Sequence, residues 1–346
     1  MEDLVVRGAI FKKGKMNSGS FSILEDKFVD GASDADFEGT LIEAPVNFHT
    51  HLGDSFIGTE PEGTIGEIVG PNGFKIRALE NAAPSTVKRS IGKSIRFMND
   101  VGTQAFFDFR ESGIKGLELA PKTSDIQGYF LTRPNKKTEI LPLLDRSAGF
   151  GMSAISDYDF EYLRDLSQKA HERNKLFAIH FSEDRREDVN KLTELDPDFI
   201  IHGVEMRESD IRVIKKHNIP VSITPKSNIF HGKRPDYARL IRSGLTVLLG
   251  TDNAFITEPN IMEEAEFLYR YQRNINRLKP EEVLSTVIDN PRKVISGFGM
   301  KMNLQKYLFF PNEILTAYQL VTRPNYYEKI IVTKKGNRIT FFSSKH

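Results

Sequence analysis

The sequence predicts an α/β protein: a TIM-like (β/α)8 barrel joined to a small β-sandwich formed from both ends of the chain. Short apolar runs bounded by turn or charged residues alternate with helical patterns, which indicates a parallel sheet. The length of 346 residues suits a barrel of about 250 residues with an accessory layer. No GxGxxG motif follows the first strand, which disfavours an open dinucleotide-binding sheet. The eight predicted strands span 41–49, 103–109, 127–133, 148–155, 176–182, 199–204, 219–224 and 246–251.

The segments between the predicted strands carry helical patterns, for example over 158–173 and 207–217. The longest interval, 53–102, contains a Gly-rich stretch followed by a predicted helix over 75–99. An insertion of this length after the first strand is typical of a lid or a substrate-binding loop.

Short β-like runs also occupy both ends of the chain, LVVRGAIF and FSILE near the start and KIIVTKK and RITFF near the end. Neither group is large enough to bury a face by itself. We therefore expect residues 1–40 and 303–346 to form one composite β-sandwich, packed against a barrel that spans 41–302.

The composition narrows the functional classes. With 48 basic and 47 acidic residues the formal charge is +1, so nothing indicates a nucleic-acid or membrane-surface partner. The chain has no cysteine, which excludes disulfides and thiolate metal ligands. The first residues contain no apolar stretch long enough for a signal peptide, and no later run is long enough to span a bilayer. We expect a cytoplasmic protein with a small-molecule substrate, and a homodimer remains open.

Histidine and aspartate residues close several of the predicted strands. His49 and His51 lie in APVNFHTHLG, His180 in LFAIHFSED, His202 in FIIHG and Asp252 in VLLGTDNA. Residues two apart in a strand point to the same face, so His49 and His51 can bind one ion together. Imidazole and carboxylate are also the ligands of catalytic zinc. A single histidine is more often an ordinary polar residue, but the repetition at strand ends predicts a metal centre at the mouth of the barrel.

Five motifs in order, HTH, IHFSE, IHG, TPKSN and GTDN, resemble the amidohydrolase superfamily. The resemblance is strongest to its branch of chlorohydrolases and purine, nucleoside and cytosine deaminases, including S-adenosylhomocysteine-type deaminases. It covers nearly the whole chain and implies a distorted barrel with one divalent transition metal. The implied ligands are His49, His51, His180 and Asp252. Zinc is the default metal, and iron suits the same ligands.

Glu183 follows His180 at the spacing of the His-x-x-Glu motif, in which the family's glutamate moves a proton between water and a ring nitrogen of the substrate. A buried carboxyl with a raised pKa can act as both base and acid. The alternative is a solvated acid within the charged run SEDRRED. We expect Glu183 to be catalytic.

The resemblance assigns His202 to polarise or orient water or substrate in a one-metal site, or to bind the second ion in a two-metal site. Two-metal members often bridge their ions with a carboxylated lysine on strand 4, and this chain has no lysine between Lys137 and Lys169. One metal is therefore favoured. Asp252 is expected to be catalytic as well as a ligand, because it can orient the attacking water and take its proton.

Substrate contacts are predicted at the ends of the second and third strands, where Arg110 and Arg133 lie. Either guanidinium can hold a carboxylate or a ribose oxygen. Salt bridges with Glu111 or other neighbouring acids are the alternative. Asn228, in TPKSN, and His231 just beyond it are further candidates.

Together these features predict a metal-dependent hydrolase of carbon–nitrogen bonds that deaminates an aminated purine or pyrimidine base or nucleoside. One alternative is hydrolysis of a cyclic amide, as in imidazolonepropionase-like relatives. Another is a non-catalytic scaffold on the same barrel, which the survival of all four ligands and the acid/base disfavours.

Overall fold

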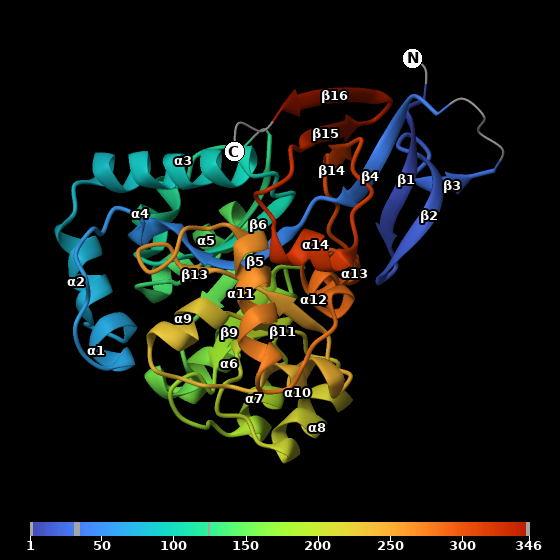
Figure 1. Ribbon diagram of the computed structural model, residues 1–346. Helices are drawn as coiled ribbons and strands as arrows, with labels where there is room; N and C mark the ends of the chain where they lie inside the picture. The colour runs from blue at the N-terminus through green and yellow to red at the C-terminus, as the bar shows by residue number, and fades with distance from the viewer. Residues whose placement is uncertain (1–2, 31–34, 124, 344–346) are drawn as a thin grey trace.

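A computed structural model describes residues 3–30, 35–123 and 125–343 (Figure 1). A curled sheet of nine parallel strands forms the body of the molecule, in the order β12-β11-β10-β9-β8-β7-β6-β5-β13. Each of the eight predicted strand regions contributes to this sheet, so the predicted alternation of strands and helices is confirmed. The strands are β5 (Val46–His51), β6 (Ala105–Arg110), β7 (Gln127–Thr132), β8 (Gly149–Met152), β9 (Leu176–Phe181), β10 (Phe199–His202), β11 (Val221–Ile223), β12 (Val247–Leu249) and β13 (Asp252–Asn253).

The last strand region brings the two edges of this sheet together. β12 lies at one edge, and β13, which begins three residues later, pairs in parallel with β5 at the other edge. A Cβ atom on Gly250 would lie 2.5 Å from the Cβ atom of His49, so only glycine allows the chain to pass β5 this closely. Asn47 and Thr251 then join the two segments. The amide of Asn47 donates to Thr251 Oγ1 at 2.8 Å and accepts from the Thr251 backbone at 3.1 Å.

Helices follow the strands and cover the outside of the sheet (Figure 1). Helix α6 is representative: the Asp159 side chain caps it by accepting from the backbone N–H of Tyr162, and Leu163 and Leu166 on its inner face are buried. Among the described residues no helix is both long and apolar enough to cross a membrane. The helices after the insertion are α4 (Gly113–Glu118), α5 (Ile140–Arg146), α6 (Phe160–His171), α7 (Val189–Leu195), α8 (Glu208–Lys216), α9 (Pro225–Phe230), α10 (Tyr237–Arg242), α11 (Ile261–Arg273), α12 (Pro280–Val287), α13 (Asp289–Gly297) and α14 (Ala317–Thr322).

The insertion after β5 contains three helices, α1 (Ile65–Val69), α2 (Phe74–Asn81) and α3 (Pro84–Asp100), at the left and upper left of Figure 1. The prediction of one helix over 75–99 is therefore wrong. Pro84 occupies the first turn of α3 and disfavours helical geometry at the residue before it, so Ala83 is extended (ψ 131°) and the helix is divided.

The two ends of the chain form a second sheet of seven strands, in the order β16-β15-β14-β4-β1-β2-β3. Strands from both ends of the chain are thus joined in one sheet, and the composite β-sandwich stays a prediction. The rings of Phe21 in β2 and Tyr307 in β14 lie 6.3 Å apart although two strands separate them, because the sheet curls around a small apolar core. The strands are β1 (Val5–Lys12), β2 (Lys15–Ser22), β3 (Lys27–Val29), β4 (Phe37–Glu43), β14 (Gln305–Pro311), β15 (Ile330–Lys335) and β16 (Arg338–Ser343).

The predicted strand over 41–49 belongs to both sheets, which corrects the expectation of one continuous strand. Its first part is the end of β4, in the terminal sheet, and its second part is β5, in the parallel sheet. Pro45 lies between the two and has no N–H to donate to a strand ladder, so the chain changes sheets at this residue.

Aromatic side chains fill the interior of the parallel sheet. Phe48 stacks on Phe107 with ring centroids 4.1 Å apart, and Phe199 packs edge-on against Phe48 at 5.1 Å. Phe109 lies in the next layer and contacts the imidazole of His49 at 4.5 Å. The polar residues at the carboxyl ends of the strands therefore rest on a rigid apolar floor.

Candidate metal centre and catalytic site

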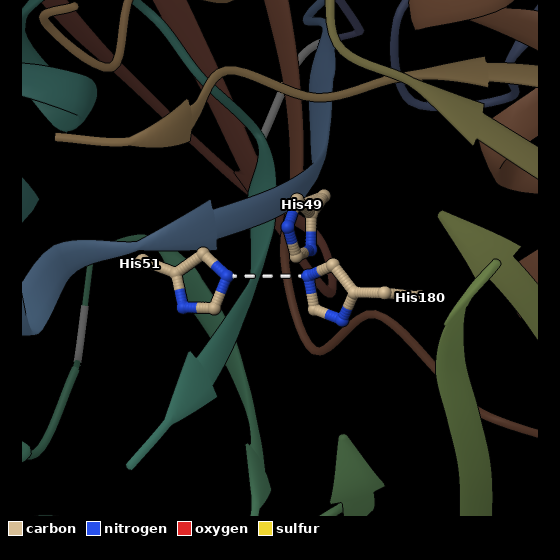
Figure 2. A group of neighbouring side chains, drawn as sticks. All are labelled: His49, His51 and His180. Carbon is tan, nitrogen blue, oxygen red and sulfur yellow. Dashed lines mark hydrogen bonds between the residues drawn. The ribbon is translucent and has the colours of Figure 1, made fainter. Parts of the chain in front are cut away.

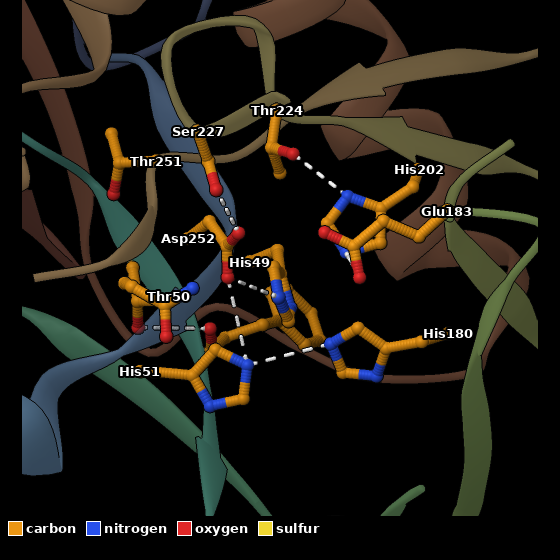
Figure 3. Close-up of polar contacts among 12 residues, drawn as sticks. His49, Thr50, His51, His180, Glu183, His202, Thr224, Ser227, Thr251 and Asp252 are labelled. Atoms are coloured by element: carbon orange, nitrogen blue, oxygen red, sulfur yellow. Dashed lines mark hydrogen bonds and ion pairs between the residues drawn. The ribbon is translucent and has the colours of Figure 1, made fainter. Parts of the chain in front are cut away.

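The strand-end residues singled out in the sequence converge at one end of the parallel sheet (Figures 2 and 3). One potential ligand atom from each of His49, His51 and His180 lies within 4.8 Å of the others, and the same holds for His49, His202 and Asp252. These side chains come from four strands separated widely in sequence. Their convergence follows from the parallel arrangement, which places all carboxyl ends at the same end of the sheet.

His51 and His180 direct their Nε2 atoms at each other (Figure 2). His180 Nδ1 lies 2.7 Å from the carbonyl oxygen of Met152, and His51 Nδ1 lies 2.8 Å from Glu111 Oε1. Each Nδ1 must carry the ring proton, because a bare nitrogen would repel an acceptor at that distance. Both Nε2 atoms are then unprotonated, yet they are 3.4 Å apart. Two lone pairs held this close fit a cation between them.

His49 and Asp252 complete this group. His49 Nδ1 is buried without a hydrogen bond to the described residues, and His49 Nε2 lies 3.2 Å from Asp252 Oδ1. The same carboxylate oxygen is 3.6 Å from His51 Nε2. Its other oxygen accepts a 2.5 Å hydrogen bond from Ser227 Oγ, which fixes the orientation of the carboxylate (Figure 3). Three nitrogens and one oxygen form a donor set that suits zinc.

The electrostatics of the site agree with metal binding. Burial lowers the pKa of His51 to about 4 and the pKa of His180 well below its ordinary value, so both rings are neutral. Neutral imidazole is the form that binds metals. Burial alone would raise the pKa of Asp252, but the neighbouring imidazoles outweigh burial and hold it well below its ordinary value. The site thus offers the neutral imidazoles of His51 and His180 and the anionic carboxylate of Asp252 as potential ligands.

Left-handed backbone conformations concentrate at the strand ends. Ser182, His202 and Asp252 have φ angles of 51°, 73° and 62°. Such angles cost side-chain-bearing residues about 1–3 kcal/mol each and persist where the surrounding structure enforces them, often at functional sites. Here they turn the His202 and Asp252 side chains into the site.

Glu183 and His202 form a second pair next to the histidine cluster, with Glu183 Oε2 3.4 Å from His202 Nε2 (Figure 3). Burial, and then the negative charge of Asp252, raise the pKa of Glu183 to about 8. Burial lowers the pKa of His202 to about 3, so this ring is neutral. Near pH 7 the pair therefore consists of a protonated carboxyl and a neutral imidazole.

A network behind His202 favours one tautomer of its ring. Asn228 Oδ1 accepts from the hydroxyl of Tyr237 at 2.8 Å, and the hydroxyl of Thr224 lies 2.9 Å from His202 Nδ1 and can donate to it. The amide nitrogen of Asn228 then faces His202 Nδ1 at 3.2 Å and donates to it. The ring proton consequently lies on Nε2, which points toward Glu183 and the site.

The four predicted substrate contacts are placed differently from one another. Arg133 lines the cavity next to the site, and its buried Nε has no hydrogen bond to the described residues. The cavity lining does not include Arg110, whose guanidinium lies 3.4 Å from Asp108 Oδ2, or Asn228, which lies behind His202. His231 is also outside the lining. Contact with substrate thus stays a prediction for each residue, and the geometry supports it for Arg133 alone.

The cavity has a volume of about 300 Å³. His51, His180, Glu183, His202 and Asp252 line it on the side of the strand ends, and residues of the insertion after β5 line another side. The insertion residues on that side are Ile65, Gly66, Val69, Gly70, Pro71 and Lys75. The insertion thus lines part of the cavity, and its role as a lid or substrate loop stays a prediction.

Sequence reasoning missed Lys75, and it considered Glu111 only as a salt-bridge partner of Arg110. In the structure Arg110 pairs with another neighbouring acid, Asp108, which the salt-bridge alternative allowed, while Glu111 contacts both His51 and Lys75. Glu111 had one available signal, since it directly follows the second strand, where site residues collect. Lys75 had no such signal, because a lysine in a polar helix is ordinarily solvated.

The chain matches the amidohydrolase family over residues 41–293 and belongs to it. A protein of Archaeoglobus fulgidus, provisionally named an aminohydrolase, is 31% identical over 268 residues, which are 77% of this chain and 74% of that protein. The 5-methylthioadenosine/S-adenosylhomocysteine deaminase of Thermococcus kodakarensis is 29% identical over 149 residues, or 38% of this chain and 35% of that protein. The chain is therefore an enzyme of the amidohydrolase superfamily.

Solved structures show the same fold at low identity. Aminofutalosine deaminase of Helicobacter pylori, in complex with methylthio-coformycin, superposes with a TM-score of 0.73 at 14% identity, covering 97% of this chain and 100% of that one. A zinc-bound adenosine deaminase of Xanthomonas campestris superposes with a TM-score of 0.62 at 13% identity, covering 94% and 87%. These likenesses establish the shared architecture.

Proposed function

We propose that this enzyme deaminates an amino-substituted purine or pyrimidine base or nucleoside, using one divalent transition metal, zinc. The observation that carries the proposal is the position of Glu183, which faces the cavity beside the histidine cluster and next to His202. A carboxyl at this position can act on a substrate while the other four side chains hold the metal. The named deaminases among the relatives and structural neighbours support the same reaction class.

His49, His51, His180 and Asp252 would hold the metal, and iron suits the same donor set. When bound, zinc lowers the pKa of a coordinated water to about 7 and so supplies hydroxide at neutral pH. Two carboxyl groups of the chain, those of Asp252 and Glu183, transfer the protons. Asp252, oriented by Ser227, takes the proton of the attacking water, and Glu183 transfers its proton to the ring nitrogen beside the attacked carbon.

His202 can donate a hydrogen bond from Nε2 to the oxygen that is added to the attacked carbon. This hydrogen bond stabilises the negative charge that develops on that oxygen. The leaving amino group then accepts the proton held by Asp252 and departs as ammonia. The hydroxyl on the ring carbon gives its proton back to Glu183, and its oxygen stays as the carbonyl. Water and the substrate thus give the carbonyl product and ammonia. Because the cavity is about 300 Å³, it suits a base or a small nucleoside.

An ammonia-release screen of the zinc-reconstituted enzyme tests this proposal. The panel is adenine, adenosine, cytosine, guanine and thioether nucleosides, and we expect ammonia from at least one of them. The cyclic-amide alternative would instead give a new carboxylate without ammonia, so cyclic amides belong in the same panel. Carboxylate formation from a cyclic amide, with no ammonia from any amino heterocycle, would overturn the deaminase proposal.

A further inference from the structure

Helix α2 places a lysine in the interior of the protein. Lys75 is the buried residue of this helix, with 4% of its surface exposed. Neighbouring Arg77, by contrast, is exposed. A lysine is almost never fully buried unless it is paired. The insertion therefore docks against the barrel through a charged group, whose partners must account for its burial.

The partners of Lys75 lie at the metal centre. Its Nζ is 2.7 Å from Glu111 Oε1, 3.2 Å from Asn253 Oδ1 and 4.0 Å from Asp54 Oδ2. Asn253 directly follows the ligand Asp252. The same Glu111 oxygen is 2.8 Å from Nδ1 of His51, so an unbroken series of contacts runs from the insertion to a metal ligand.

We infer that Lys75 is a positioning residue that holds Glu111 against His51 and thereby couples closure of the insertion to the geometry of the metal ligands. Without the ammonium group, the buried carboxylate of Glu111 would lose its ion-pair partner, and its orientation would be less fixed. His51 would then lose the contact that fixes its tautomer and aims Nε2 at the centre. Partners of this kind are worth about 10–100-fold in metal affinity.

The coupling also acts in the opposite direction. Lys75 and Ile65, Val69 and Pro71 of the same insertion line the cavity, so an insertion that is not anchored at Lys75 leaves that wall unsupported. Loss of the metal would loosen His51, Glu111 and Lys75 in turn. The inference rests on the proposed function only in requiring that the centre bind a metal, and it needs no particular substrate.

Metal competition with a chromogenic chelator tests the inference without using activity. We expect Lys75→Met to lower zinc affinity by about 10–100-fold. Arg77→Met, on the exposed side of the same helix, is the matched control and should change affinity less than twofold. Glu111→Gln should weaken zinc binding to a similar extent. The double variant should be no weaker than the worse single variant, because both changes break one series of contacts.

Chemical rescue separates loss of charge from loss of folding. The chain has no cysteine, so Lys75→Cys carries a unique thiol. Alkylating it in the unfolded state with 2-bromoethylamine restores an ammonium at nearly the length of lysine, whereas iodoacetamide gives a neutral side chain of similar size. After refolding, we expect the ammonium form to bind zinc at least tenfold more tightly than the neutral form.

Limited proteolysis measures the reverse coupling. Glu67 lies in helix α1, and a glutamate-specific protease can cut there once this helix is locally unfolded, which an anchored insertion disfavours. We expect zinc removal and Lys75→Met each to accelerate this cut severalfold, with Arg77→Met unchanged. The inference is overturned if the neutral and ammonium forms at position 75 bind zinc equally, or if the effects of Lys75→Met and Glu111→Gln add. An enzyme that passes these tests but releases no ammonia would contradict only the proposed function.

Discussion

The two ends of the parallel barrel are built from opposite kinds of interaction. At the mouth, four imidazoles and the carboxyl groups of Glu183 and Asp252 are crowded together, and two imidazole lone pairs face each other. At the opposite end, which we call the floor, the rings of Phe48, Phe107 and Phe199 pack against one another, and Phe298 of the segment after α13 stacks on Phe199. The crowded polar groups at the mouth lower the free energy of unfolding but are placed to bind a ligand. The packed rings at the floor raise the free energy of unfolding and compensate for this cost.

The largest expected effect is at the floor. Phe199→Ala should lower the free energy of unfolding by about 3–5 kcal/mol, because it removes a buried ring and leaves a cavity among other rings. Urea denaturation would measure it. Zinc stoichiometry of the folded variant should stay unchanged. A loss below about 1 kcal/mol would mean that the floor is not the main support of the barrel.

At the mouth, Glu183→Gln should lower turnover by about a hundredfold or more, the usual contribution of a positioned acid/base. The change keeps the size and hydrogen-bonding capacity of the side chain but removes the titrating proton. Metal content and unfolding free energy should be close to those of the wild type. Glu194→Gln, on the exposed face of α7, is the control.

Two results would change the assignment of Glu183. If Glu183→Gln lost the metal, Glu183 would be a ligand. If it kept near-normal turnover, another group would carry the proton, and His202 would be the first candidate to test. Metal analysis alongside steady-state kinetics distinguishes the two.

Removing the metal should destabilise the protein by about 2.7 kcal/mol relative to a solution with free zinc at a hundred times its dissociation constant. The physical reason is that zinc binds the folded chain and not the unfolded chain, so its binding free energy adds to the free energy of unfolding. Thermal unfolding with zinc and with a chelator would show the difference. Asp252→Asn should reduce or abolish it, and an equal shift in that variant would show that zinc acts elsewhere.

The smallest expected effect lies at the floor, where His171 Nε2 is 3.2 Å from Asp198 Oδ2. The hydrogen bond to Asp198 raises the pKa of His171 above its ordinary value. Its stabilisation is therefore complete below about pH 6.5 and is lost as pH rises through the raised, folded-state pKa. His171→Gln should cost at most about 1 kcal/mol at pH 5.5, since the imidazole is about a third exposed, and less at pH 9. Urea denaturation at both pH values checks this, and an equal loss at the two would contradict it.

The sequence predicted those features of the mouth and the floor that depend on short runs of neighbouring residues. Apolar runs located the parallel strands, and the ionisable residues at their ends identified the cluster at the mouth. The division of 41–49 and the break before Pro84 were not predicted, because apolar character continues through Ala44 and Ala83 while the backbone geometry changes. In both cases proline carried the missing signal.

The contacts of Lys75 and Gly250 could not be predicted, because they depend on segments far apart in the chain. Nothing near Lys75 indicates that it contacts Asn253, 178 residues later. Gly250 reads as an ordinary turn residue until β5 is seen to pass beside it. Such residues are recognisable only when the folded strands are brought together.

The pairing of β13 with β5 also has a consequence for biosynthesis. Asn47 and Thr251, which join these strands, are 204 residues apart, and the proposed ligands His49 and Asp252 lie beside them. At a translation rate of about 5–20 residues per second, the ribosome delivers Asp252 about 10–40 s after His49. A nascent chain therefore exposes a two-histidine site long before the full centre exists. If these residues hold the proposed metal, complete loading requires a chain that has finished synthesising the barrel.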